Sequence, residues 1–199
     1  YSMPAMSPLY SAPPFEYRDN WSQHITFKSD PKVVGKYIPK PLVPNPQGLM
    51  FLLTSYFFAS AFGHYRESTL CAHATFKGLP VNYTLFLMLN ADVPICGGRE
   101  IWGWPKKLGR IEMEERDAVI QTTVERGGIQ LVRAAMSMDQ LVSAEKLKGT
   151  TKYVNWKFIP SVKNDSPPDV SQLTLTELTN FIPHRVYRGP ATLEFFDSP

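Results

Sequence analysis

Alternation of apolar and polar side chains marks much of the chain. Residues 21–27 place Trp, Gln, Ile and Phe at every second position, which is typical of a strand. Residues 49–61 are almost continuously apolar and rich in aromatic residues, which predicts a strand buried on both faces. Gly127-Gly128 lies between two alternating runs and predicts a hairpin. Further strands are predicted at residues 69–76, 81–90, 118–124, 129–138, 153–160, 173–178 and 191–195.

One segment has the pattern of a helix start. Ser29 or Asp30 can cap the helix, and Pro31 suits its first turn. The apolar face of this helix consists of Val33, Val34, Tyr37 and Ile38. A proline-rich loop over residues 39–48 follows, and residues 143–147 predict one short helical turn. The whole pattern predicts a mainly β (α+β) fold, a strand-dominated sandwich or barrel with one clear helix.

The chain length allows one domain with an extension. Residues 1–14 hold four prolines among small residues, which predicts an extended arm lying on the domain or on a neighbouring subunit. The chain has 199 residues, and 43% of them are hydrophobic, so residues 15–199 can bury the core of a single domain.

Charge and composition exclude several classes of protein. The 21 Lys and Arg residues nearly balance the 18 Asp and Glu residues and are scattered, which argues against nucleic-acid binding. The longest apolar stretch is shorter than the roughly 20 residues of a transmembrane helix, and no signal peptide is visible. Cys71 and Cys96 cannot build a disulfide framework, so we expect a reducing, cytoplasmic setting and no membrane partner.

The common catalytic and metal-binding motifs are absent from the sequence. It contains no HExxH, no CxxC, no GxSxG and no phosphate-binding glycine loop. Cys71 and His73 lie two residues apart, but nothing nearby completes the three or four ligands that zinc needs. We therefore expect no metal site, and Cys96 before Gly97-Gly98 is best explained as a turn or core residue.

Residues 97–109 stand out, because two adjacent lysines lie in a stretch broken by glycine and rich in tryptophan. An arbitrary pair of lysines would be the solvated end of a strand. Here Trp104, Pro105 and Leu108 flank the pair, so partial desolvation is expected. Desolvation and a second cation both disfavour an ammonium group, and a neutral amine can attack a ketone to form a Schiff base.

The same segment resembles a known family. GRE at residues 98–100 and PKKL at residues 105–108 are similar to the central motif of the acetoacetate decarboxylase family. That family is itself the standing example of a lysine activated by a neighbouring cation. Supporting similarities are YIPKPL at residues 37–42, YRES at residues 65–68 and GPATLEFFD at residues 189–197. The resemblance implies a mostly antiparallel β-structure, with a cone-like barrel around the lysine and a few peripheral helices.

The resemblance also assigns the amine chemistry. The Schiff-base lysine of the family falls on Lys106, and the neighbouring lysine that favours its neutral form falls on Lys107. A family glutamate falls on Glu67, although a glutamate beside Arg66 could equally be a solvated loop residue.

The positions expected to bind substrate depart from the family pattern. The family arginine of the first strand falls on Asn20, and Arg18 replaces it only through a two-residue shift. A second family glutamate falls on Leu52. Arg99 could orient substrate or form an ion pair with Glu100 behind the lysine loop. We include Trp104 as a candidate lining residue, with a simple core position as the alternative.

These residues predict a cofactor-free lyase that decarboxylates a small-molecule β-keto acid other than acetoacetate. A lysine-dependent aldolase or dehydratase is one alternative, and a non-catalytic barrel for a hydrophobic ligand is another. We also expect a homo-oligomer, because residues 1–14 have too little apolar content to fold alone and the family is generally oligomeric.

Overall fold

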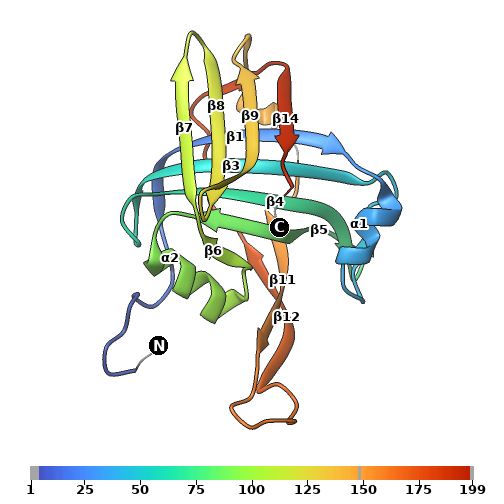
Figure 1. Cartoon of the computed structure of the whole chain (residues 1–199). Helices are drawn as coiled ribbons and strands as arrows, with labels where there is room; N and C mark the ends of the chain where they lie inside the picture. The colour runs from blue at the N-terminus through green and yellow to red at the C-terminus, as the bar shows by residue number, and fades with distance from the viewer. Residues whose placement is uncertain (1–4, 148, 198–199) are drawn as a thin grey trace.

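Strands dominate the computed structural model, which describes residues 5–147 and 149–197 (Figure 1). Its larger sheet contains β1 (Tyr17–Lys28), β2 (Val43–Pro44), β3 (Leu49–Ser60), β4 (Tyr65–Phe76), β5 (Leu79–Leu89), β6 (Lys106–Leu108), β11 (Lys152–Ile159) and β12 (Val170–Glu177). A smaller sheet contains β7 (Arg110–Arg116), β8 (Val119–Arg126), β9 (Ile129–Ser137) and β14 (Ala191–Phe195). A separate pair consists of β10 (Gln140–Val142) and β13 (Val186–Arg188).

Short helical elements join the strands. They are α1 (Pro31–Tyr37), α2 (Asp92–Gly97), a π-helical turn that continues α2 over Gly98–Trp102, and a 3-10 turn at Ala144–Lys146. The helix predicted after residue 30 is confirmed, and the Asp30 side chain caps it by accepting from Lys32 N at 2.8 Å. Its apolar face is narrower than predicted, since Val34 is buried whereas Tyr37 is exposed. Within the described residues, no helix is long and apolar enough to cross a lipid bilayer.

The topology corrects two details of the predicted architecture. The larger sheet runs in the order β1-β3-β4-β5-β11-β12, with β2 on β4 and β6 on β5, and the smaller in the order β14-β9-β8-β7. These orders describe open sheets in the part of the chain that the structure covers, so the sandwich description fits and the closed barrel does not. Most pairs are antiparallel as expected, but β5 pairs in parallel with β11 and with β6.

A core fills the space between the two sheets, whose strands cross one another in Figure 1. The alternation predicted at residues 21–27 is confirmed, because Gln23 and Ile25 are buried toward the smaller sheet. Gln23 Nε2 donates to the carbonyl of Ile120 on β8 at 2.9 Å. The buried members of this inter-sheet core are Ile25, Leu52, Met88, Ile111, Val124, Val132 and Ala134.

The opposite face of the larger sheet is covered by α2 and the π-helical turn. Since successive side chains of a strand point to opposite faces, Phe51 and Cys71 lie on this second face. They pack with Tyr153, and Trp104 joins them from the segment after the π-helical turn. A neighbouring cluster on this face contains Tyr65, Leu87 and Leu89, packed with Tyr17, Phe57, Phe62, Ala91, Ile95 and Trp104.

The sequence pattern did not predict several elements, which are α2 with its π-helical continuation, the strand β7, and the short strands β2, β6, β10 and β13. The helix α2 and its continuation lie in a segment where glycines predicted only a break. The strand β7 has an alternating signal, in which Ile111 and Met113 are buried between charged residues. The hairpin at Gly127-Gly128 is confirmed, and it joins β8 to β9.

His24 on β1 makes the stability depend on pH. Its ring packs edge-on against Phe51 at 4.6 Å between centroids. Although the residue is exposed at the surface, desolvation by its neighbours lowers the pKa of His24 from 6.5, with a further contribution from His73. The unfolded chain therefore binds this proton more readily than the folded protein. We predict that the free energy of unfolding decreases as the pH falls below about 6.5. Urea unfolding between about pH 7.5 and 5.5 should show a weaker pH dependence in His24→Gln, and an unchanged dependence would contradict the assignment.

Candidate active site

Lys106 lies on β6, a three-residue strand whose only strand partner in the described structure is β5 of the larger sheet. Strand β6 runs parallel to β5 and pairs Lys106 with Leu87. Lys106 is buried, with 8% of its surface exposed, whereas Lys107 is exposed. Because side chains alternate along a strand, Lys107 points away from the face on which Lys106 lies.

Glu67 of β4 meets Lys106 on the face covered by α2. The Nζ atom of Lys106 donates to Oε2 of Glu67 at 2.9 Å. The two side chains are 9% and 15% exposed, so this ion pair is largely removed from water. Thr69, two residues further along β4, donates weakly to the other carboxylate oxygen at 3.5 Å. The structure therefore brings together two of the three residues predicted to be catalytic, from positions 39 residues apart.

Protonated groups surround this pair. Burial raises the pKa of Tyr17 to about 12 and that of the Cys71 thiol to about 12, and the nearby Glu67 carboxylate adds to both shifts. Burial also raises the pKa of Tyr65 and of Tyr153, again with a contribution from Glu67. These side chains keep their protons at ordinary pH. Tyr17 and Tyr65 are hydrogen-bonded to each other, Tyr153 to Asn82, and the Cys71 thiol to Thr84.

Aromatic rings complete the surroundings of the amine. The centre of the Tyr65 ring lies 6.0 Å from Nζ of Lys106. Trp104 packs against Tyr153 with ring centroids 5.2 Å apart, so this predicted lining residue lies on the same face of the sheet. Tyr65 and Tyr153 were not identified from the sequence, although Tyr65 belongs to the YRES segment that identified Glu67.

The π-helical turn closes back onto Lys106. The backbone N–H of Trp104 donates to the carbonyl of Gly98 at 3.1 Å, and Gly103 adopts a left-handed conformation with φ 70°. Arg99 donates from Nη1 to the backbone carbonyl of Lys106 at 3.1 Å. Arg99 therefore holds the backbone of the lysine strand.

The N-terminal arm covers the outside of this turn. Tyr10 is 7% exposed, and its hydroxyl donates to Oε2 of Glu100. Phe15, which follows the arm, packs on Phe62 with centroids 4.4 Å apart and on Trp102 at 5.6 Å. Part of the arm thus lies on its own domain and supports the segment that precedes the lysine.

The remaining predicted substrate-binding positions lie apart from the pair. Arg18 is exposed and forms an ion pair with Glu16 at 3.2 Å. Asn20 is also exposed and lies opposite Phe57 in the register of β1 and β3. Leu52 is 1% exposed and belongs to the inter-sheet core. Because its neighbours Phe51 and Leu53 pack with Trp104 and Tyr153, Leu52 points away from the Lys106 face.

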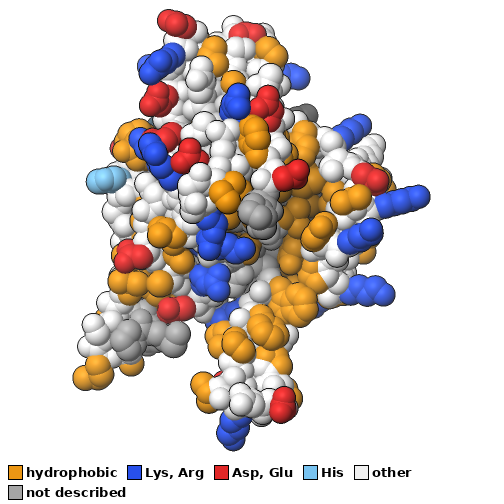
Figure 2. Space-filling model, in the orientation of Figure 1, with side chains coloured by type: hydrophobic (Ala, Val, Ile, Leu, Met, Phe, Trp, Pro, Cys, Tyr) orange, Lys and Arg blue, Asp and Glu red, His pale blue; other side chains and the backbone are white. Residues whose placement is uncertain are grey.

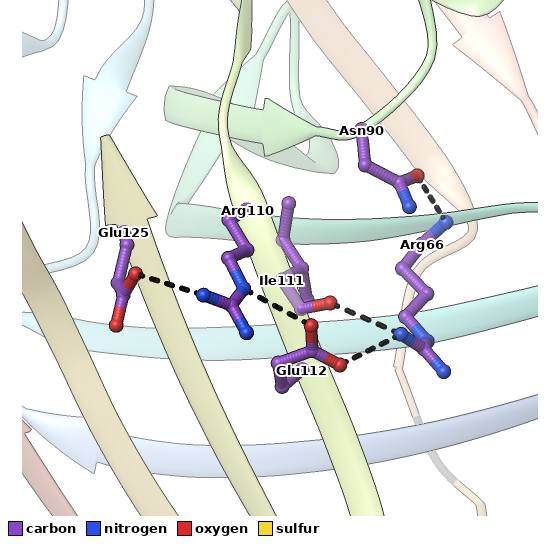
Figure 3. A network of polar contacts seen from close by, with 6 residues as sticks. All are labelled: Arg66, Asn90, Arg110, Ile111, Glu112 and Glu125. Atoms are coloured by element: carbon purple, nitrogen blue, oxygen red, sulfur yellow. Dashed lines mark hydrogen bonds and ion pairs between the residues drawn. The ribbon is translucent and has the colours of Figure 1, made fainter. Parts of the chain in front are cut away.

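A charged network on the inter-sheet side supports the strand that carries Glu67 (Figure 3). Arg66 forms an ion pair with Glu112 of β7 at 2.8 Å, and Glu112 accepts in turn from Arg110 at 3.2 Å. The backbone N–H of Arg66 donates to Oδ1 of Asn90 at 2.8 Å. This network ties the start of β4 to the smaller sheet and to the end of β5, one residue before Glu67. The sequence alone gave no sign of this role for Arg66, which belongs to the YRES segment beside Glu67.

An apolar groove lies elsewhere on the molecule and carries no comparable chemistry. It has a volume of about 390 Å³ and is lined by Phe27, Lys28, Ser29, Met50, Leu70, Leu193 and Phe195. Figure 2 shows hydrophobic side chains gathered along the hollow between the smaller sheet and the part of the molecule that carries α1. Shape alone would favour this groove. The chemistry favours the Lys106 face, where an amine, a carboxylate and several hydroxyl groups converge.

The described residues contain no group of three or more His, Cys, Asp or Glu side chains arranged to hold a metal ion.

Comparison with known proteins supports the family resemblance seen in the sequence. The sequence profile of the acetoacetate decarboxylase family matches residues 2–199. Acetoacetate decarboxylase 2 of Mesorhizobium japonicum is 29% identical over 98% of this chain and 76% of its own length. Acetoacetate decarboxylase 1 of Bradyrhizobium diazoefficiens is 30% identical over 98% of this chain and 79% of its own length.

Solved structures give the same result for the fold. The acetoacetate decarboxylase of Legionella pneumophila has a TM-score of 0.91 and 28% identity, and the match covers 100% of this chain and 80% of that one. The enduracididine biosynthesis enzyme MppR, solved with the condensation product of pyruvate and imidazole 4-carboxaldehyde, has a TM-score of 0.87. At 17% identity over 100% of this chain and 84% of its own, MppR is similar in fold alone.

The chain therefore belongs to the acetoacetate decarboxylase family. The two relatives named above by sequence are acetoacetate decarboxylases, and the chain is a decarboxylase-type or acetoacetate decarboxylase-like enzyme.

A substitution at Leu52 tests whether this side chain lies on the inter-sheet face of the larger sheet, away from Lys106. We predict that Leu52→Glu lowers the free energy of unfolding by more than about 2 kcal/mol, because it buries a carboxylate among apolar side chains. It should not raise turnover of acetoacetate, since the carboxylate would lie on the face away from Lys106. Urea unfolding measures the first effect. Leu141→Glu, at a position 65% exposed, is the control and should change stability by at most about 0.5 kcal/mol. A stable Leu52→Glu protein with increased acetoacetate turnover would show that the assignment is wrong.

Proposed function

We propose that this protein is a Schiff-base lyase that decarboxylates a β-keto acid, with Lys106 as the nucleophile. The observation that supports the proposal is the buried contact of 2.9 Å between the Lys106 amine and the Glu67 carboxylate. A charged pair in an aromatic, largely dry environment is costly to maintain for structure alone. It suits an amine that must lose and regain a proton during each turnover.

The reaction begins with transfer of a proton from the Lys106 ammonium to Glu67. The free electron pair of Nζ attacks the keto carbon to form a carbinolamine. Glu67 then returns its proton to the carbinolamine hydroxyl, which leaves as water, and a protonated imine forms. The bond between the α-carbon and the carboxylate then breaks. Its electron pair moves into the imine to form an enamine, and CO2 leaves.

Proton return completes the cycle. The α-carbon of the enamine takes the one proton that the overall reaction consumes, which Glu67 picks up from solvent and delivers. Water then hydrolyses the imine to release the ketone and the Lys106 ammonium. Oε2 of Glu67 lies 2.9 Å from Nζ, so the carboxyl group lies close to the amine at which the substrate would be bound. The surrounding rings exclude bulk water, which strengthens these electrostatic interactions.

The surroundings also favour a particular kind of substrate. Tyr17, Tyr65 and Tyr153 are protonated donors near Glu67 and are suited to hold a keto or carboxylate oxygen. Arg18 is exposed and already paired with Glu16, so no arginine from the first strand reaches the buried pair in the described structure. Apolar neighbours such as Leu87 and Trp104 suit a hydrophobic substituent. We therefore propose a β-keto acid larger than acetoacetate.

Trapping the imine tests this proposal. Incubation with a panel of β-keto acids and sodium borohydride should attach the reduced substrate to the peptide that contains Lys106. Lys106→Ala should lose the adduct and lower turnover by about a thousandfold or more, because the nucleophile is removed. Lys107→Ala is the matched control, since its side chain is exposed and points away, and it should still be trapped at Lys106. An adduct on another lysine, or full activity of Lys106→Ala, would overturn the proposal.

A second function uses the same lysine for condensation. The support is the shared fold of MppR, which was solved with a condensation product of pyruvate and an aldehyde. The imine of pyruvate can lose a proton from its methyl group to form an enamine, and the enamine carbon can attack an aldehyde to form a new carbon–carbon bond, with the aldehyde oxygen taking up a proton. Measuring CO2 release from β-keto acids against product formation from pyruvate and an aldehyde distinguishes the two. A protein that gives no adduct with any keto acid would instead fit a non-catalytic binding role.

A further inference from the structure

Gly98 lies directly against the side chain of Lys106. A Cβ atom placed on Gly98 would lie 2.6 Å from Cδ of Lys106, 2.6 Å from Cε and 3.3 Å from Nζ. These are the three nearest heavy atoms, and all of them belong to Lys106. Carbon atoms that are not bonded normally stay about 3.5 Å or more apart, so even one methyl group does not fit beside the lysine as it stands.

The backbone of Gly98 does not itself require glycine. Its φ of −65° and ψ of −43° are ordinary right-handed helical values, at which alanine is the better helix former. Gly103 in the same turn is different, because its φ is 70° and a Cβ there would lie 2.4 Å from Cα of Lys157. Gly103 is therefore explained by the backbone, whereas Gly98 is explained by its contact with Lys106.

The turn that carries Gly98 is held against the lysine strand. The Gly98 carbonyl accepts from the N–H of Trp104 at 3.1 Å. The next residue, Arg99, donates to the backbone carbonyl of Lys106 at 3.1 Å. Tyr10 holds the outside of the turn through Glu100. Because the backbone is fixed on both sides, a methyl group at residue 98 would displace the flexible end of the Lys106 side chain.

We propose that Gly98 is a positioning residue for Lys106. The bare backbone at residue 98 lets the methylene groups of the lysine pass close to it, and this path leads Nζ to its position 2.9 Å from Glu67. The proposal rests on the proposed function for its catalytic consequence, but the steric contact itself does not depend on that function. A displaced amine would lose its proton partner and its approach to the keto carbon.

The activity of Gly98→Ala tests the catalytic consequence. We expect the rate of borohydride-trapped adduct formation and kcat to fall by about tenfold to a hundredfold, while KM changes by less than about threefold. The matched control is Gly35→Ala in α1, where a Cβ would meet Pro44 Cγ at an ordinary 3.7 Å, and its trapping rate and kcat should equal those of the unaltered protein. Trapping of Gly98→Ala at the unaltered rate would overturn the proposal.

A double-mutant cycle tests the contact itself and needs no turnover. The change in stability caused by Gly98→Ala is measured by urea unfolding in the unaltered protein and in Lys106→Ala. We expect the methyl group to be less favourable when Lys106 is present, because only then does it meet the lysine. Equal effects in both backgrounds would overturn the proposal. If the unaltered protein forms no adduct with any keto acid, the proposed function fails, and the cycle still decides whether Gly98 positions Lys106.

Discussion

The buried contact between Lys106 and Glu67 is the constraint on which the rest of the site depends. Each charge would be costly in this apolar setting without the other, and breaking such a pair by removing one partner costs about 3–5 kcal/mol. The surrounding structure keeps the two groups together. Strand β6 holds the lysine beside β5, and the Arg66 network holds the start of β4 from the opposite side. The positions of the amine and the carboxylate are thus maintained by a short strand on one side and by a charged network on the opposite face of the sheet.

The two faces of the larger sheet have different roles, because one forms the core between the sheets and the other carries the Lys106–Glu67 ion pair. One face packs on the smaller sheet and forms the core that includes Ile25 and Leu52. The other carries the ion pair and the tyrosines beneath α2 and the π-helical turn. Arg66 and Glu67 are adjacent in sequence, but their side chains lie on opposite faces of the sheet because strand side chains alternate. The same alternation separates Lys106, which is buried, from Lys107, which is exposed.

Local patterns predicted the elements that depend on local physics. The cap at Asp30, the hairpin at Gly127-Gly128 and the buried alternation around Ile25 follow from backbone conformation and burial on one face. The helix α2 was missed because a six-residue helix gives too little periodicity, and its glycines are typical of turns. The motif at residues 98–108 drew attention to Lys106, and YRES drew attention to Glu67, because both segments resemble stretches of the family to which the chain belongs.

By itself, the sequence determined the family, the strand-rich class and the two groups that form the ion pair. Only the tertiary structure decided which further residues share their face. Counting along the sequence assigned a substrate-binding position to Leu52, but the register of β3 and β4 places Ser55 opposite Glu67 and leaves Leu52 in the inter-sheet core. A strand has a period of two, so a displacement of one residue moves a side chain to the other face of the sheet. The role of Gly98 was likewise invisible in sequence, because it arises from contact with a lysine eight residues away, across a turn whose closure depends on tertiary hydrogen bonds.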